Sequence, residues 1–326
     1  MPLGIKSGEE GCYLEMKNKK AGRGEFIRKR ILPNWQLYLL LIIPVIYIMI
    51  FAYYPIISGV RIAFSDYSIV KGIWGSPWAG FTNFARFFRN YQFFPVIRNT
   101  ISLSLYSMIA GFPFPIILAL ALNYTRKKWF KKTVQMVTYA PYFISTIVLV
   151  GMMLQLFAYN GIINAIIGNF GAGPYDFLGK PDTFPSMYVW SGVWQGVGFG
   201  SIIYLAVLSN SDEEIHEAAT IDGASKTQRI RYIDIHLLMP TATILLIMNV
   251  GSILNIGFEK VFAMQNPLNL RTSEVLSTLI YKTSLKAIIP DFSYGTAVGF
   301  FQSTVGLLMI ILLNQVSKKL SDTSLW

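Results

Sequence analysis

Residues 35–60 have the sequence WQLYLLLIIPVIYIMIFAYYPIISGV, in which no side chain is charged. The hydrocarbon core of a bilayer is about 30 Å thick, and a helix of about 20 apolar residues crosses it. An uninterrupted apolar block of this length favours a lipid environment over the interior of a globular protein. The stretch therefore predicts a membrane-spanning helix.

Five further blocks of this kind follow along the chain. They lie at about residues 100–122, 133–157, 184–208, 237–261 and 294–316. The second and fifth of the six blocks contain prolines or glycines, which spanning helices tolerate and which often mark kinks. The sequence therefore predicts an all-α membrane protein with six transmembrane helices.

The composition agrees with this prediction. Charged residues make up 14% of the chain and hydrophobic residues 53%, whereas a soluble domain has about a quarter charged residues. The single cysteine, Cys12, excludes an intrachain disulfide and a cysteine-based metal cluster, and the two histidines are too few for a His-rich metal site. The basic N-terminal stretch precedes an apolar block that is too long for a cleavable signal peptide.

The basic residues are distributed unevenly between the two sides that six spans define. Eighteen of the 28 Lys and Arg residues lie in the N-terminal tail, the loops after the second and fourth spans, and the C-terminal tail. Because cytoplasmic loops carry the excess of Lys and Arg, both termini are predicted to be cytoplasmic. The net charge of +11 then faces anionic lipid headgroups, and nucleic acid is not needed as a partner.

The loop between the fourth and fifth spans carries strong helix signals. Residues 211–225 have the sequence SDEEIHEAATIDGAS. Ser211 and Glu214 have the spacing of a capping box, and Gly223 can adopt the left-handed conformation that commonly ends a helix. Ser225 can cap a second short helix. An ordinary connector is the alternative interpretation, but connectors are usually short, so a helix-turn-helix is predicted here.

Within this loop, Glu217-Ala218-Ala219-x-x-Asp222-Gly223-Ala224 resembles the EAA motif of bacterial binding-protein-dependent ABC importer permeases. Pro240 stands at the second proline of that pattern, whereas His236 replaces the usual first proline. Further resemblance extends over nearly the whole chain, including residues 139–145, 196–199 and 294–299. It is greatest to the maltose-importer-like carbohydrate-uptake family, and within it to the polysaccharide and oligosaccharide permeases.

The resemblance implies a function and a set of partners. The chain is expected to be one permease subunit of an ATP-binding-cassette importer in the bacterial cytoplasmic membrane, moving an oligosaccharide that an extracytoplasmic solute-binding protein delivers. Its implied partners are a second homologous permease subunit, an ATP-binding cassette ATPase dimer and membrane lipid. The chain itself is expected not to be an enzyme and to hold no cofactor, since ATP and Mg would be bound by the ATPase. It also lacks a G-x-x-x-x-G-K-[ST] phosphate loop.

The implied organisation has three parts: a basic cytoplasmic tail over 1–33, a permease domain over 34–317, and a cytoplasmic tail over 318–326. The loop at 211–240 would transmit movement by lying in a groove of the ATPase. The residues expected to couple it to the ATPase are Glu217, Ala218, Ala219, Asp222, Gly223, Ala224 and Pro240.

Polar side chains inside spans are costly unless they face protein or water, so those that occur are candidates for the substrate pathway. Two tryptophans in the fourth span could also stack on sugar rings. The alternative is that these groups bond or pack between helices. The candidates are Trp190, Trp194, Gln195, Asn249, Ser252, Asn255 and Gln302.

Two other classes of protein compete with an importer permease. An ion-coupled secondary transporter would be expected to place carboxylates or interrupted helices near the middle of the membrane, and the predicted spans contain almost no acidic residue. A membrane scaffold without transport activity is the remaining alternative.

Overall fold

The computed structural model describes residues 32–320, and the regular elements within them are helical, with no strand. Five helical runs are long and apolar enough to cross a membrane, and a bent pair of helices makes a sixth crossing if it forms one span. The prediction of an all-α membrane fold is therefore confirmed. The tail predicted over 1–33 lies almost wholly outside the described residues, and the tail predicted over 318–326 lies partly outside them.

The chain divides into two compact units, residues 1–59 and 60–326. The first unit contains most of one helical run, which extends from Trp35 to Ala63. A π-helical turn widens this run just before Pro55, where the missing proline N–H leaves an earlier carbonyl without its usual donor. The segments are η2 (Leu32–Asn34), α3 (Trp35–Ile48), η3 (Met49–Tyr53) and α4 (Tyr54–Ala63).

In the second unit, the second span is one helical run and the third is broken. The third span is bent by 99°, because a 3-10 turn containing Pro141 ends its first half. Ser145 then begins a new helix, its side chain accepting a hydrogen bond from the Val148 N–H (3.4 Å). The segments are α7 (Phe93–Gly111) and α8 (Pro113–Asn123), followed by α9 (Lys128–Tyr139), η4 (Ala140–Phe143) and α10 (Thr146–Leu156).

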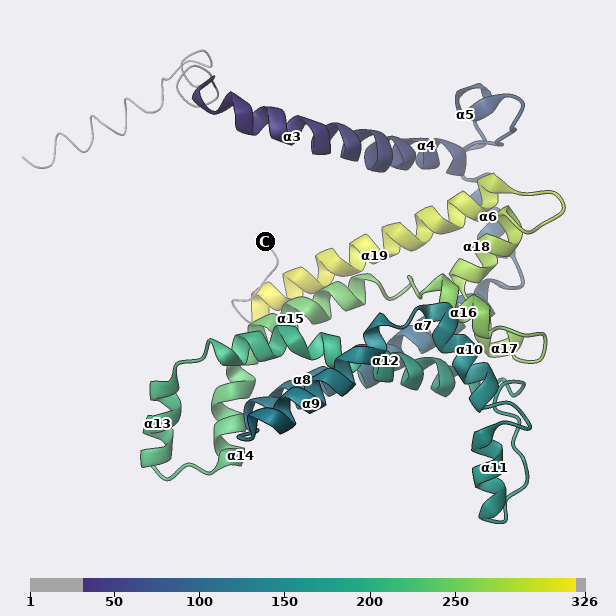
Figure 1. Cartoon of the computed structure of the whole chain (residues 1–326). Coiled ribbons are helices and arrows are strands. Elements are labelled where there is room, and N and C mark those ends of the chain that lie inside the picture. Colours follow the sequence, from purple (N-terminus) through teal and green to yellow (C-terminus); the bar gives the residue numbers. More distant parts are fainter. Residues whose placement is uncertain (1–31, 321–326) are drawn as a thin grey trace, which may run out of the picture. The chain divides into compact units, whose positions relative to one another are not determined.

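Helix α12 (Phe184–Ser209) is the fourth span, and it packs against α7, α8, α9 and α15 (Figure 1). Glycine allows one of these approaches: a Cβ at Gly198 would overlap the backbone carbonyl of Thr138 in α9. A Cβ at Gly200 would lie 3.2 Å from the Pro115 ring in α8. Helix α12 thus lies close to the third span through backbone contact and to the second span through the Pro115 ring.

The helix of the fifth span ends earlier along the chain than the sequence predicts. The helical run stops at Gly251, and residues 252–257 are not helical, so the prediction of a helix reaching residue 261 is wrong. Gly251 lies against the Ile310 side chain, and a Cβ at Gly306 would lie 2.6 Å from the Gly251 carbonyl oxygen. The run consists of α14 (Lys226–Arg229), η5 (Ile230–Asp234) and α15 (Ile235–Gly251), and the sixth span is α19 (Phe292–Leu320).

The remaining helices are short, and most of them connect the spans. Asn83 fixes one of these segments, because its side-chain amide donates to the carbonyls of Ala63 and Ser65, both at 3.0 Å. The short helices are α5 (Gly72–Gly75), α6 (Thr82–Arg89), α11 (Ile162–Asn169), α13 (Glu213–Ile221), α16 (Phe258–Met264), α17 (Leu270–Ser273) and α18 (Leu276–Ser284).

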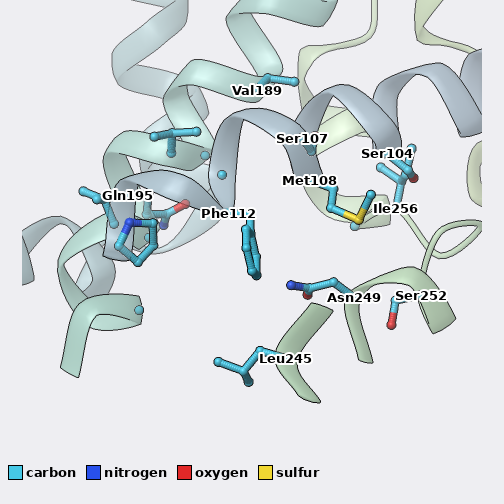
Figure 2. A pocket seen from close by; sticks show the side chains of 18 of the residues that line it. Ser104, Ser107, Met108, Phe112, Val189, Gln195, Leu245, Asn249, Ser252 and Ile256 are labelled. Atoms are coloured by element: carbon cyan, nitrogen blue, oxygen red, sulfur yellow. The ribbon is translucent and has the colours of Figure 1, made fainter. Parts of the chain in front are cut away.

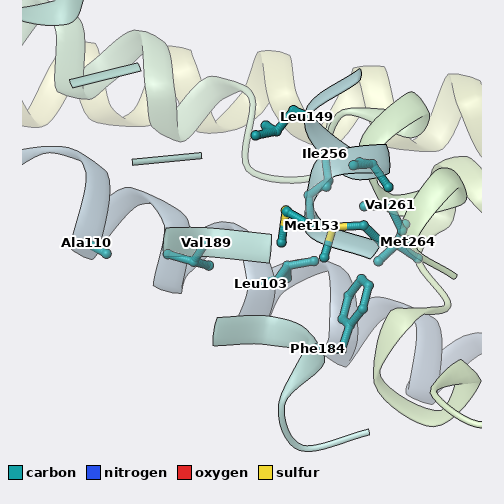
Figure 3. Packing of buried hydrophobic residues seen from close by; sticks show 11 residues of the cluster. Leu103, Ala110, Leu149, Met153, Phe184, Val189, Ile256, Val261 and Met264 are labelled. Carbon is teal, nitrogen blue, oxygen red and sulfur yellow. The ribbon is translucent and has the colours of Figure 1, made fainter. Parts of the chain in front are cut away.

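The largest cluster of buried apolar side chains lies where the broken third span meets α7, α12 and α16. Figure 3 shows Leu103, Met153, Phe184 and Met264 converging there from four different helices. Val261 and Val275 in the same cluster are fully buried. This packing fixes α16 beside α12, and α16 carries a residue of the cavity described below.

Candidate functional site

The loop at 211–240 contains two helices joined by a tight turn. Helix α13 begins at Asp212, whose carboxylate accepts a hydrogen bond from the Glu214 N–H (3.0 Å). The predicted cap, Ser211, instead donates its hydroxyl to the Leu208 carbonyl (2.7 Å), so that prediction is wrong. Asp212 and Glu213 also place acidic side chains at the positive end of the helix dipole, which favours negative charge.

Gly223 makes the turn at the end of α13, as predicted, with a φ of +80°. The Ala224 N–H donates to the Ala219 carbonyl (2.9 Å), and the Gly223 N–H donates to the Thr220 carbonyl (3.1 Å). This pair of bonds is a Schellman motif, which satisfies carbonyls that a helix end would otherwise leave free. The glycine of the EAA pattern therefore has a local structural cause.

Ser225 begins α14, also as predicted. Its hydroxyl accepts from the Gln228 N–H, and the Gln228 side chain accepts from the Ser225 N–H (2.7 Å), which completes a capping box. Arg229 in α14 donates to the Thr220 hydroxyl in α13 (2.9 Å). The two arms are therefore tied to each other. Glu217 and Ala218 on α13, and Asp222 directly after it, are exposed.

A buried carboxylate connects this loop to the spans. Asp234 in η5 is fully buried, and its Oδ2 accepts a hydrogen bond from the Tyr124 hydroxyl just after α8 (2.7 Å). His216 Nε2 in α13 lies 3.4 Å from the other oxygen, Oδ1, as an ion-pair contact rather than a hydrogen bond when the imidazole is protonated. The Asp234 side chain thus contacts α13 and the end of α8, and its own segment, η5, continues directly into α15.

Tyr124 is a constant hydrogen-bond donor in this arrangement. Burial, then the hydrogen bond to Asp234 and the negative charge of that carboxylate, together raise the pKa of its hydroxyl to about 12, against a smaller lowering by Arg229. The hydroxyl therefore keeps its proton at any physiological pH and holds Oδ2 throughout.

The helical run passes through the end of the loop without a break. His236 lies in the first turn of α15, and unlike the proline that the family usually has here, it keeps its backbone N–H. Pro240 lies inside α15 and is exposed. The substitution of histidine for proline is therefore compatible with one continuous helix from η5 into α15.

A cavity of about 610 Å³ lies between α7, α12, α15 and the non-helical segment after Gly251 (Figure 2). Figure 2 shows Phe112 and Asn249 projecting into it. Its wall is mostly apolar with a few amide and hydroxyl groups and one ammonium group, a composition typical of small-molecule sites. Four predicted pathway residues line it: Gln195, Asn249, Ser252 and Asn255.

The other three candidates lie elsewhere. Trp190 and Trp194 line a separate groove of about 590 Å³ on α12, together with side chains of α10. The Trp190 indole donates to the Tyr106 hydroxyl (2.9 Å). Gln302 lies in a smaller hollow between α15 and α19, with its amide 3.4 Å from the Asn255 side-chain oxygen. The structure therefore does not bring the two tryptophans to the cavity.

One cavity residue also has a packing role. The Gln195 amide donates to the Ile144 carbonyl (2.8 Å), at the break in the third span. That bond supplies a partner to a carbonyl that the broken helix leaves free. The interhelical alternative considered for these polar residues applies to Gln195.

Sequence reasoning did not select Lys260 for the cavity. Its ammonium lines the cavity from α16, donates to the Tyr188 carbonyl (2.9 Å) and lies 4.8 Å from the Tyr188 ring centroid. Glu259 and Lys260 are adjacent in the sequence, near the end of the predicted fifth span, and this adjacency alone predicts an ion pair between them at the membrane interface. Among the described residues, however, no carboxylate lies within 4.0 Å of its ammonium, so that pairing is wrong.

Comparison with known proteins gives consistent relatives. The family of binding-protein-dependent transport system inner membrane components matches residues 111–322. Protein LplB of Bacillus subtilis (strain 168) is 38% identical, with 94% of this chain and 96% of LplB aligned. The polygalacturonan/rhamnogalacturonan transport system permease protein YteP of the same organism is 36% identical over 94% of this chain and 95% of YteP.

A solved structure shares the fold. A chain of a bacterial alginate ABC transporter, in complex with an alginate pentasaccharide-bound periplasmic protein, superposes with a TM-score of 0.85 at 33% identity. The superposition covers 92% of this chain and 100% of that one. The chain belongs to the family of binding-protein-dependent transport system inner membrane components. It is the membrane-spanning permease of an ABC transporter, and such permeases leave ATP hydrolysis to a separate subunit.

Proposed function

We propose that this chain is one half of the permease pair of a bacterial importer for polysaccharide fragments or oligosaccharides. Support comes from the two similar proteins whose names give such substrates, the YteP permease and the alginate transporter. The cavity, with amide and hydroxyl groups on a largely apolar wall, suits a sugar. An external binding protein delivers the substrate, and an ATPase dimer binds ATP and Mg.

Both termini lie in the cytoplasm in this proposal, on the same side as the 211–240 loop. The tail at 1–33 and the tail at 318–326 then flank the permease domain at 34–317. The excess of Lys and Arg on that side supports the orientation. The same side must face the ATPase, because ATP is cytoplasmic.

The loop at 211–240 transmits ATP-driven movement to the spans. The observation that carries this proposal is the Asp234 contact set, which links α13 to the end of α8 and to the fifth span. Glu217 and Ala218 are exposed on α13 and free to contact the ATPase, and Gly223 shapes the end of that helix. Because its two arms are hydrogen-bonded and its base is anchored, the loop can act as a stiff lever.

Replacing Gly223 by Val tests the lever. A β-branched residue at a φ of +80° is strained by roughly 1–2 kcal/mol, so the turn should deform. We expect the complete complex to keep assembling but to lose most substrate-dependent uptake per ATP hydrolysed, measured in proteoliposomes.

Gly171→Val is the matched control. Gly171 has a φ of +81° and, like Gly223, no atom within 4 Å of an added Cβ, but it lies outside the loop. Coupled uptake in the Gly171 variant should stay near that of the wild type. Equal coupling in both variants would remove the role assigned to the 211–240 loop.

A further inference from the structure

Lys260 is a buried cation without a buried anion beside it. Lys260 is 8% exposed, and the salt bridges found among the described residues all involve other side chains. Glu259 precedes it in α16 but is exposed. Buried charges in proteins are normally paired, because an unpaired one bears the full cost of desolvation. A bound ligand could therefore supply the negative charge that the described residues do not place beside Lys260.

The ammonium has hydrogen-bonding capacity to spare on the cavity side. A lysine ammonium carries three donors, and one is used by the Tyr188 carbonyl. The Tyr188 ring covers another face of the group through a cation–π contact. These two contacts hold the ammonium in place without neutralising its charge.

The surrounding helix surface is shaped to leave this group accessible from the cavity. A Cβ at Gly192 of α12 would lie 3.2 Å from the ammonium, and no atom lies within 4 Å of an added Cβ at Gly196 one turn further. Gln195, Asn249 and Asn255 line the same cavity. A fixed positive charge is thus set among amides that can bond hydroxyl groups.

We infer that Lys260 is a specificity-determining residue of the cavity and that it binds the carboxylate of an acidic oligosaccharide, such as an oligouronate. A carboxylate supplies the missing counter-charge and also accepts hydrogen bonds from the remaining N–H donors of the ammonium. The hydroxyls of a neutral sugar can accept those hydrogen bonds but supply no counter-charge. Charge-assisted hydrogen bonds are about twice as strong as neutral ones. This inference rests on the proposed function, because it names the substrate class of the same cavity.

The test uses the complete complex in proteoliposomes, with its ATPase, partner permease and binding protein. The probes are oligogalacturonates and oligomannuronates and the methyl ester of each, which has the same ring system without the charge. Wild type should import the acids. Lys260→Gln should lower acid uptake about tenfold or more through a higher KM, with little change for any ester that is imported. Lys260→Arg should retain most acid uptake.

Lys180→Gln is the matched control, because the Lys180 ammonium also lies over a tyrosine ring, 3.8 Å from the Tyr175 centroid, but outside the cavity. It should transport like the wild type. Import of esters in preference to acids, or an equal loss of both in Lys260→Gln, overturns the inference and leaves the importer function standing. If the complex imports no saccharide in an ATP-dependent manner, the proposed function is overturned, and the inference with it.

Discussion

Asp234 is the residue through which the 211–240 loop contacts the membrane spans. It has no exposed surface. Its Oδ2 accepts a hydrogen bond from the Tyr124 hydroxyl at 2.7 Å, and its Oδ1 lies 3.4 Å from the His216 imidazole, an ion-pair contact when that ring is protonated. A buried carboxylate is tolerable only when such partners compensate its desolvation. The same contacts that make Asp234 tolerable also join α13 to the spans.

Replacing Tyr124 by Phe tests this junction. The change leaves Asp234 Oδ2 without its hydrogen-bond donor, which should lower the free energy of unfolding by about 1–3 kcal/mol and weaken coupling between ATP hydrolysis and uptake. Thermal unfolding of the purified complex and the ratio of uptake to hydrolysis measure the two effects.

Tyr232→Phe provides the comparison, since Tyr232 is 63% exposed in the same loop. It should change neither the unfolding temperature nor coupling. If Tyr124→Phe behaved like Tyr232→Phe, Asp234 would not be the junction described.

At this scale the sequence predicts local features and misses long-range ones. The turn at Gly223 and the cap at Ser225 were predictable because their hydrogen bonds join neighbours along the chain. Tyr124 and Asp234 are 110 residues apart, so no spacing rule could pair them. Lys260 was misassigned for a related reason: the adjacent Glu259 suggested a partner, whereas the fold turns the ammonium toward Tyr188 in α12.

At the scale of elements, α12 organises the second unit because its glycines allow close approach by the backbone of α9 and by a proline ring of α8. Gly198 receives the Thr138 carbonyl of α9, and Gly200 lies against Pro115 of α8. Close helix contact through small residues is the usual way in which membrane helices associate. The order of the spans around α12 therefore depends on residues without side chains.

Gly198→Ala should separate α12 from α9. The added methyl would overlap the Thr138 carbonyl, a backbone group that cannot rotate away, and overpacking of this kind costs about 1–3 kcal/mol or more. We expect a lower unfolding temperature and a lower yield of assembled complex.

Gly196→Ala is the control two residues earlier on the same helix, where an added Cβ meets nothing within 4 Å. Its unfolding temperature should equal or exceed that of the wild type, since alanine is the better helix former. Similar losses in both variants would show that helix flexibility, rather than packing against α9, sets stability at α12.

The extent of the spans was predictable where apolar length alone decides it. The blocks at 184–208 and 294–316 fall within α12 and α19. The bend of the third span and the early end of the fifth were not predictable from length. The bend combines a local turn at Pro141 and a cap at Ser145 with a tertiary partner, since Gln195 supplies a donor to the Ile144 carbonyl. The end of the fifth span lies where Gly251 packs against α19.

At the scale of the whole molecule, the chain is a membrane component that needs other subunits to work. It has the family's fold and a cavity, and within the described residues it has no group of His, Cys, Asp or Glu that could hold a metal ion. The secondary transporter considered above would draw its energy from an ion gradient instead. The source of energy therefore separates the two classes most clearly.

The decisive measurement is oligosaccharide uptake into sealed proteoliposomes that contain this chain, its partner permease and the ATPase. Uptake should require both ATP and the solute-binding protein on the opposite side of the membrane, and it should be insensitive to collapse of proton and sodium gradients. Uptake that persists without ATP and disappears with the ion gradient would contradict the assignment of this chain as an ABC importer permease.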